Sequence, residues 1–298
     1  MKQGSNFAHW QQQVQNHTEQ TLNRLLPLSD ELPAPLIDAM RYAALDGGKR
    51  LRPMLVFAAA ELGNNIAEAV DNAIAAIECI HIYSLVHDDM PEMDNDSLRH
   101  GKAACHIRYT PATALLVGDA LQSMAFSLLS RPTTLSPERQ LQMVQTLAQA
   151  AGCSGMAGGQ AIDLACVGKS LNQNELEHMH QLKTGALIRS AVALGGLCCN
   201  DIDQHQLTAL DAYAGHLGLA FQVIDDVLDC EQDSGVLGKT AGKDAQANKP
   251  TYVSLLGLAS ARRYAENLVQ KALEALAGFD HRAEHLRELA QFVIARNH

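Results

Sequence analysis

Two groups of aspartates, far apart in the chain, have the residue types and spacing needed to bind metal ions. The first is D-D-M-P-E-M-D over residues 88–94, and the second is D-D-V-L-D over residues 225–229. Asp225 and Asp229 are four residues apart, so on a helix their like charges repel unless a cation compensates them. Mg²⁺ typically takes one or two carboxylates together with substrate phosphates. Either group alone could be a solvated acidic surface, but together they predict two acidic walls that hold Mg²⁺ and a diphosphate.

The basic residues are grouped at a few joints, although the chain as a whole is acidic. The segment G-G-K-R-L-R-P over residues 47–53 puts three cations on a turn that could cradle a phosphate. The segment K-T-G over residues 183–185 adds a cation and a hydroxyl. Three lysines follow the second aspartate group in a Gly-containing segment, where we expect a lid: Lys239, Lys243 and Lys249. Each pattern alone could be an ordinary solvated joint, but beside two acidic groups they predict a diphosphate site.

Helices must position these residues. Hydrophobic residues make up 47% of the chain and aromatic residues only 4%, so the core is built from small and aliphatic side chains that favour helices. From Pro33 onward, apolar residues recur at helical spacing between short joints rich in Gly and Pro, and none of these joints is long enough for an interdomain linker. The sequence therefore predicts an all-α, single-domain bundle over residues 1–298, with roughly ten or more helices around a central active-site cavity.

Two of the predicted helices carry the aspartates. One begins near Ala69 and must stop or kink at Pro91, which places the first aspartate group at its end. His81, Ser84 and Asp88 share a face of this apolar helix. A polar stripe there predicts a cavity, because burial without partners is unfavourable. The other helix begins near Asp203 and carries the second group.

Charge and cysteine content exclude several classes of protein. A net charge of -10 argues against broad nucleic-acid binding, which needs a surplus of Lys and Arg. Seven scattered cysteines without a C-x-x-C pair are typical of core residues in a reducing cytoplasm. The first twenty residues are too polar for a signal peptide, and the apolar stretches 73–86 and 186–199 fall short of a membrane span. We therefore expect a soluble cytoplasmic protein with no membrane span.

In this order, the motifs resemble those of the trans-prenyl diphosphate synthases. They are G-G-K-R-L-R-P, D-D-x-x-x-x-D with a following Arg, G-Q-x-x-D, K-T-G, F-Q-x-x-D-D-x-x-D and the downstream lysines. The resemblance runs from about Pro33 to the end, and the interval within the first aspartate motif is similar to that of the bacterial farnesyl diphosphate synthases. It implies a homodimeric prenyltransferase of isoprenoid biosynthesis. Such an enzyme condenses isopentenyl diphosphate head-to-tail with dimethylallyl and geranyl diphosphate to give farnesyl diphosphate, with Mg²⁺ as cofactor or Mn²⁺ in its place.

The resemblance also implies roles for individual residues. Isopentenyl diphosphate would be bound by Lys49, Arg52, His81 and His100. The allylic diphosphate would contact Arg99, Lys183, Thr184, Gln222, Lys239 and Lys249. The metal ligands would be Asp88, Asp94, Asp225 and Asp229, and the catalytic set would be Asp88, Asp89, Asp94, Lys183, Asp225 and Asp226.

Two positions bear on specificity. Tyr83 and Ser84 lie five and four residues before Asp88, where a bulky side chain in the family limits the product to farnesyl length; an ordinary core tyrosine is the alternative. The family usually has Arg-Arg-Gly after the first aspartate motif, whereas this chain has Arg99-His100-Gly101. Because imidazole titrates near neutrality, His100 predicts a weaker or pH-dependent contact with isopentenyl diphosphate.

Other functions remain open at the level of the sequence. No spacing excludes a geranylgeranyl diphosphate synthase. A class I terpene cyclase would need neither the Lys49 and Arg52 pair nor a second D-D-x-x-D motif. The intact carboxylates argue against a non-catalytic subunit of a heteromeric synthase. His87 and Asp88 lack the further spaced ligands of a metal phosphohydrolase.

Overall fold

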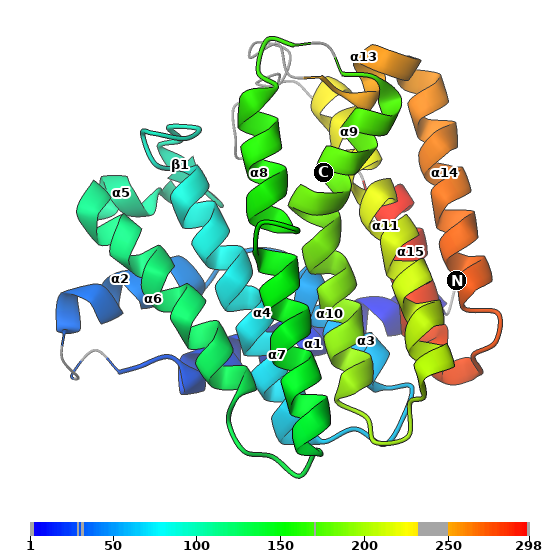
Figure 1. Cartoon of the computed structure of the whole chain (residues 1–298), viewed down its shortest axis with the longest axis horizontal. Coiled ribbons are helices and arrows are strands. Elements are labelled where there is room, and N and C mark those ends of the chain that lie inside the picture. The colour runs from blue at the N-terminus through cyan, green and yellow to red at the C-terminus, as the bar shows by residue number, and fades with distance from the viewer. Residues whose placement is uncertain (1–2, 29, 31–32, 170, 232–249, 297–298) are drawn as a thin grey trace.

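The structure, a computed structural model, describes residues 3–28, 30, 33–169, 171–231 and 250–296 (Figure 1). Its first half contains α1 (Gln3–Leu25), α2 (Ala34–Ala44), α3 (Leu51–Ala60), α4 (Ala67–Asp88), β1 (Leu98–Arg99), β2 (Lys102–Ala103), α5 (Cys105–Arg108), α6 (Pro111–Leu129) and α7 (Pro137–Ala151). Its second half contains α8 (Met156–Ala165), α9 (Gln173–His180), η1 (Gln181–Gly185), α10 (Ala186–Leu197), α11 (Gln204–Glu231), α13 (Tyr252–Leu256), α14 (Leu258–Ala275), η2 (His281–Ala283) and α15 (Glu284–Ala295). The all-α prediction is confirmed, with one short hairpin as the exception.

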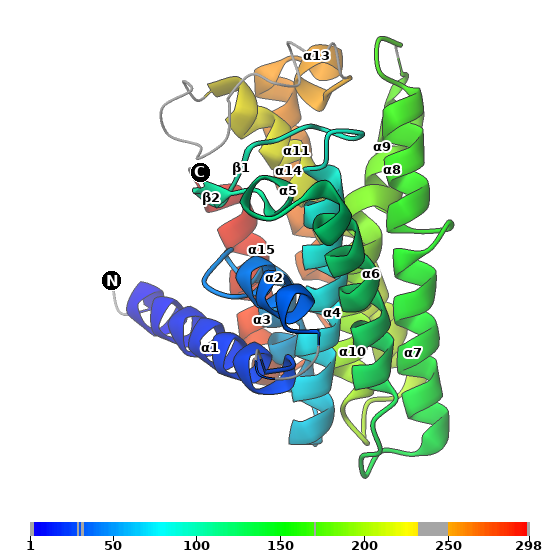
Figure 2. The ribbon, with the colours of Figure 1, turned by 90° about the vertical axis from the view of Figure 1, so that its left-hand side faces the viewer.

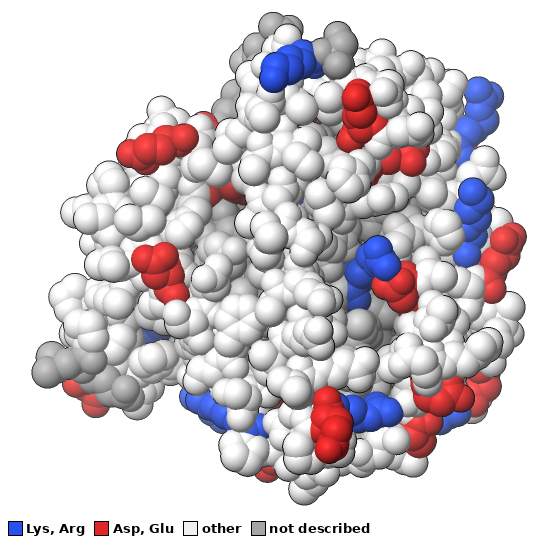
Figure 3. Space-filling view, viewed as in Figure 1, with Lys and Arg blue, Asp and Glu red and all other residues white. Residues whose placement is uncertain are grey.

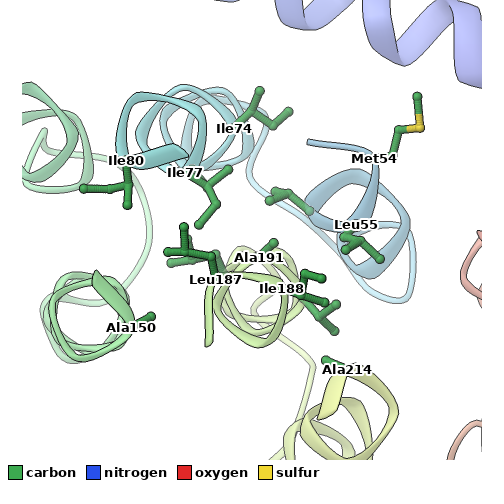
Figure 4. Packing of buried hydrophobic residues seen from close by; sticks show 14 of the residues in the cluster. Met54, Leu55, Ile74, Ile77, Ile80, Ala150, Leu187, Ile188, Ala191 and Ala214 are labelled. Carbon is green, nitrogen blue, oxygen red and sulfur yellow. The ribbon is translucent and has the colours of Figure 1, made fainter. Parts of the chain in front are cut away.

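Helix α10 lies at the centre of the bundle, surrounded by α3, α4, α7 and α11 (Figure 4). Its sequence is apolar on nearly every face, as expected of a helix with neighbours on all sides. Gly195 lets α3 approach closely, because a Cβ at this position would lie 2.2 Å from the Val56 carbonyl oxygen. The core is thus built from aliphatic side chains and close backbone contacts, as the aromatic-poor composition predicts.

Helices α4 and α11 flank α10 and run in the same direction, so that their C-terminal ends meet at one end of the molecule (Figures 1 and 2). Helix α4 ends at Asp88, before Pro91, and α11 begins at Gln204, both close to the predicted positions. This parallel arrangement brings two aspartate groups that are far apart in sequence to the same end of the bundle.

The short hairpin follows the first aspartate group. Strands β1 and β2 pair antiparallel, and the two residues between them, His100 and Gly101, have φ of 50° and 76°. Positive φ at both central positions is the geometry that matches the twist of a two-residue hairpin. The hairpin is too short to show a period of two in the sequence.

Helices α4 and α6 are long and apolar enough to cross a membrane by length and composition alone. Helix α4 is longer than the apolar stretch 73–86, which by itself falls short of a membrane span, and 72% of its apolar window is buried in the core. Only 39% of the corresponding window of α6 is buried. The apolar character of α4 is therefore explained by its place in the core, whereas α6 keeps an exposed apolar face.

Candidate active site

The two adjacent aspartates of the first motif, Asp88 and Asp89, have different environments. Asp88 ends α4, and its carbonyl accepts from the Asp94 backbone amide at 2.8 Å, which folds the following loop back. Burial raises the pKa of Asp88 to about 6, Lys183 acts to lower it, and Asp94 raises it further. Asp89, in contrast, is 2% exposed and is bound by the Arg99 guanidinium. Asp88 therefore faces Asp94 and Lys183, whereas Asp89 holds the loop to the hairpin.

The second motif repeats this division. Asp226 is buried, and its carboxylate accepts from the Tyr252 backbone amide at 2.8 Å and from the Gln222 side chain at 3.4 Å. Asp225 is more exposed and is bound by Arg296 at the end of α15. Asp229 lies one turn further along α11 and is half-buried. In each motif, one aspartate side chain faces charged groups of the site. Its neighbour is buried and bonds to a later segment of the chain, Asp89 to Arg99 and Asp226 to Tyr252.

Lys183 and Thr184 lie in η1, a single π-helical turn of the kind found at functional sites. The Lys183 ammonium lies 2.5 Å from the carboxylate of Asp163 on α8. The Thr184 hydroxyl donates to the Gln222 side-chain oxygen at 3.0 Å, which joins the K-T-G and F-Q motifs directly. Sequence reasoning did not select Asp163, although it is the final residue of the G-Q-x-x-D motif.

Burial disfavours the positively charged form of three basic residues, Lys49, Arg52 and His81. Burial lowers the pKa of all three residues. The charge of Arg296 lowers the pKa of Lys49 further, and the charges of Arg52 and His100 lower the pKa of His81 further. Asp225 opposes the shift at Lys49 and Arg52, so these cations lie near the second acidic wall. The Arg52 Nε has no hydrogen-bond partner among the described residues. An anion bound here would relieve the disfavoured positive charge.

The hairpin places Arg99 and His100 on opposite sides of the turn. Arg99 is 14% exposed, and its guanidinium is bound to Asp89. The His100 ring lies over the Gly47-Gly48 turn, since a Cβ at Gly47 would come within 3.3 Å of its Nδ1. His100 is thus beside the G-G-K-R segment, as expected for a contact to the same ligand.

The Tyr83 side chain extends from α4 toward α6. Its ring is 8% exposed and contacts the His87 ring edge-on at 5.7 Å. Burial raises its pKa, while a hydrogen bond with the Gln122 side chain on α6, in which the phenolic oxygen accepts, opposes the shift. The neighbouring Ser84 hydroxyl donates to the His81 carbonyl at 2.7 Å. Tyr83 is therefore fixed one to two turns below Asp88, where a ring could limit the depth of a pocket.

The C-terminal end of α15 reaches the second acidic wall. The Arg296 guanidinium stacks 3.9 Å from the Phe221 ring centroid and donates to the Phe221 carbonyl as well as to Asp225. A cavity of about 260 Å³ lies beside it between α1, α3, α11 and α15, and Lys49 forms part of its wall. The end of α15 thus lies against the Asp225 side of the site.

The carboxylates fit a metal that is completed by substrate. Among the described residues, no three Asp, Glu, His or Cys side chains form a metal-binding group. Burial raises the pKa of Asp88 and Asp94 adds to the shift, so a bound cation would favour its charged form. Mg²⁺ suits such positions because it takes one or two carboxylates and keeps water and phosphate ligands.

The fold and the site together are those of a helical bundle with two aspartate groups at one end, and the comparisons with known proteins agree. The sequence model of the polyprenyl synthetase family matches residues 33–290, so the chain belongs to this family. A farnesyl diphosphate synthase from Haemophilus influenzae is 45% identical over 293 residues, covering 97% of this chain and 98% of that protein. The resemblance to trans-prenyl diphosphate synthases is confirmed.

Solved structures give the same result. An apo FPP/GFPP synthase from Zymomonas mobilis has a TM-score of 0.87 and 40% identity, covering 97% of this chain and 99% of that one. A geranyltransferase from Helicobacter pylori, solved with magnesium and isoprenyl diphosphate, has a TM-score of 0.84 and 32% identity, covering 95% and 97%. The similarity extends over nearly the whole length of each chain.

Proposed function

We propose that this protein is a prenyltransferase that makes farnesyl diphosphate from isopentenyl diphosphate and dimethylallyl or geranyl diphosphate. The observation that carries this proposal is the meeting of the two aspartate groups at one end of the bundle, beside a cluster of Lys49, Arg52 and His81. Carboxylates for metal ions and cations for diphosphates are the groups that the reaction requires. The relatives named as farnesyl diphosphate synthases support the same reaction.

The proposed roles of the residues follow their environments. Asp88, Asp94 and Asp225, with Asp229, would hold the metal ions, and Asp89 and Asp226 would fix the loops behind them. Lys49, Arg52, His81 and His100 would bind isopentenyl diphosphate. Arg99, Lys183, Thr184 and Gln222 would bind or position the allylic diphosphate. Lys239 and Lys249, proposed for the same diphosphate, lie outside the described residues.

The reaction follows from the placement of charge. When the allylic carbon–oxygen bond ionises, Lys183 and its neighbours stabilise the negative charge that develops on the departing diphosphate. Bound Mg²⁺, or Mn²⁺ in its place, supplies further neutralisation of this charge. The cations of the second site hold isopentenyl diphosphate so that its double bond attacks the carbocation. Loss of a proton, with the released diphosphate as acceptor, completes the new allylic product.

Product length depends on the side chain below Asp88. The burial of Tyr83 and its hydrogen bond with Gln122 support a fixed floor that stops elongation at fifteen carbons. A geranylgeranyl product is the alternative. A terpene cyclase or a silent subunit accounts less well for two acidic walls and a separate cationic cluster.

The test is incubation of the purified protein with labelled isopentenyl diphosphate and either dimethylallyl or geranyl diphosphate, with and without Mg²⁺. Chromatography of the dephosphorylated products should give farnesol only when metal is present. Geranylgeraniol would keep the reaction class and overturn the role of Tyr83. If neither primer were elongated, the prenyltransferase assignment itself would be wrong.

The exposed face of α6 supports a homodimer. Leu115 and Leu116 are 48% and 53% exposed, and the face of the molecule over α6 and α7 carries few charged side chains (Figure 3). Burial of such a face between two copies would remove apolar surface from water. All seven cysteines are free, which supports the proposed cytoplasmic location.

A further inference from the structure

The middle cation of the G-G-K-R-L-R-P segment does not point toward a ligand. Arg50 is 6% exposed, and its guanidinium donates to Glu78 on α4 at 3.0 Å, to Glu19 on α1 at 2.9 Å and to the Ala44 carbonyl at 2.7 Å. Burial by itself would lower the pKa of Arg50, but Glu78 and Glu19 outweigh it and the pKa is raised. Arg50 is therefore a structural cation, held by two carboxylates and a backbone carbonyl.

The turn that Arg50 holds is conformationally demanding. Asp46, Gly48 and Arg50 have φ of 56°, 79° and 54°, and two of these are not glycine. Non-glycine residues adopt this left-handed region only when surrounding contacts over-determine the backbone. The hydrogen bonds of Arg50 to Glu19, Glu78 and the Ala44 carbonyl are such contacts. They also fix the turn relative to α4, since Glu78 lies one turn before His81 on that helix.

Helix α1 holds the same turn from the outside. Glu19 accepts from the Asp46 backbone amide at 3.2 Å in addition to Arg50, and the Gln15 amide donates to the Lys49 carbonyl at 3.3 Å. Helix α1 lies across α3 and α4 (Figure 2). It is anchored near its start by Trp10, which donates to Glu61 at 3.0 Å and stacks on His285 at 4.2 Å.

We infer that α1, through Glu19 and Arg50, positions the turn that presents Lys49 and Arg52, so that this N-terminal helix is a working part of the isopentenyl diphosphate site. This helix lies outside residues 33–290, the part that the sequence model of the family matches. Glu19, Arg50 and Glu78 are positioning residues, because they act through Lys49 and Arg52. The inference rests on the proposed role of those two cations.

Glu19→Ala tests the inference because it removes the ion pair between α1 and Arg50 and leaves the buried Arg50–Glu78 pair in place. We expect the KM for isopentenyl diphosphate to rise about tenfold, because misplaced binding groups lose affinity steeply. The kcat and the KM for geranyl diphosphate should stay within about twofold, since Glu19 bonds to the turn at 46–50, whereas Lys183 and the two aspartate motifs belong to other elements. Hydrogen exchange of amides 47–51 should accelerate. Glu19→Gln, which keeps the acceptor oxygen, should recover part of the change.

Arg24→Ala is the matched control. It removes another α1 ion pair, in which Arg24 lies 2.6 Å from Asp71 on α4, well away from the turn. It should leave the KM for isopentenyl diphosphate and the exchange of amides 47–51 unchanged. Equal effects of Glu19→Ala and Arg24→Ala, or a Glu19→Ala change shared by both substrates, would mean that α1 only stabilises the fold and would overturn the inference.

Arg52→Gln separates this inference from the proposed function. If it raises the KM for isopentenyl diphosphate while Glu19→Ala does not, the binding site stands and the role of α1 is overturned. An unchanged KM in Arg52→Gln would instead overturn the assignment of the binding site, and the inference with it, even if Glu19→Ala accelerated exchange in the turn.

Discussion

At the scale of single residues, adjacent aspartates in the two motifs do different work. Asp88 and Asp225 face other charged groups of the site, whereas Asp89 and Asp226 are buried and hold Arg99 and the start of α13. Each D-D pair thus combines one carboxylate that faces charged groups of the site with one buried carboxylate that holds the surrounding chain.

Asp88→Asn should stabilise the metal-free protein while removing activity. The raised pKa of Asp88, about 6 against an ordinary 3.8, means that ionisation of this carboxyl destabilises the fold as pH rises through that interval. At pH 8, the variant should therefore melt about 2–4 °C higher than the parent without Mg²⁺.

The pH dependence provides the control for this prediction. Below the ordinary aspartate pKa, the carboxyl is protonated in the folded and unfolded states alike, so the difference in melting temperature should vanish near pH 3.5. Turnover with Mg²⁺ should fall by about 10²-fold or more. A variant that melts below the parent at pH 8 would contradict the conclusion that ionisation of the buried Asp88 carboxyl destabilises the fold.

His100→Arg should lower the KM for isopentenyl diphosphate. The ring lies over the Gly47-Gly48 turn, and a permanent charge there would strengthen the contact with a diphosphate by about two- to fivefold, the range for an exposed ion pair. Steady-state kinetics of the two proteins check this, and an unchanged KM for isopentenyl diphosphate would contradict it.

At the scale of elements, close backbone packing places the cation of η1. A Cβ at Gly159 would lie 2.2 Å from the Lys183 backbone nitrogen, so α8 and η1 can meet only at glycine. Gly159→Ala should destabilise the protein by about 1–3 kcal/mol through overpacking. It should also raise the KM for the allylic diphosphate, because Lys183 moves. Chemical denaturation and kinetics measure both effects.

Gly215→Ala is the matched control within α11. Nothing lies within 4 Å of a Cβ at this position, so the substitution should stabilise the helix by about 0.5–1 kcal/mol without altering kinetics. If both glycine variants behaved alike, the close contact of α8 and η1 would not be what positions Lys183.

At the scale of the whole molecule, the exposed face of α6 predicts self-association. Leu116→Glu should shift the protein from dimer to monomer in light scattering coupled to size-exclusion chromatography, because a carboxylate in an apolar interface loses its hydration. Leu255→Glu on α13, at a position that is 40% exposed, should leave the mass unchanged. A dimer that persists in Leu116→Glu would place the interface elsewhere.

The sequence by itself determined the helical class, the C-terminal end of α4, the start of α11 and the identity of the motifs. These features are local: Pro91 stops a helix wherever that helix packs, and apolar spacing sets the period of a segment. The prediction of one domain over residues 1–298 stays a prediction, which the continuous core from α1 to α15 supports.

Only the tertiary structure decided which of several similar residues face the site. The sequence gives no means of distinguishing Arg50 from Arg52, or Asp225 from Asp226, because each pair has the same chemistry at neighbouring positions. Burial against Glu78 and Glu19 makes Arg50 structural, and the contact with Asp163 places Lys183. These partners lie at least 20 residues away in the chain, so their contacts depend on how the helices pack rather than on any local pattern.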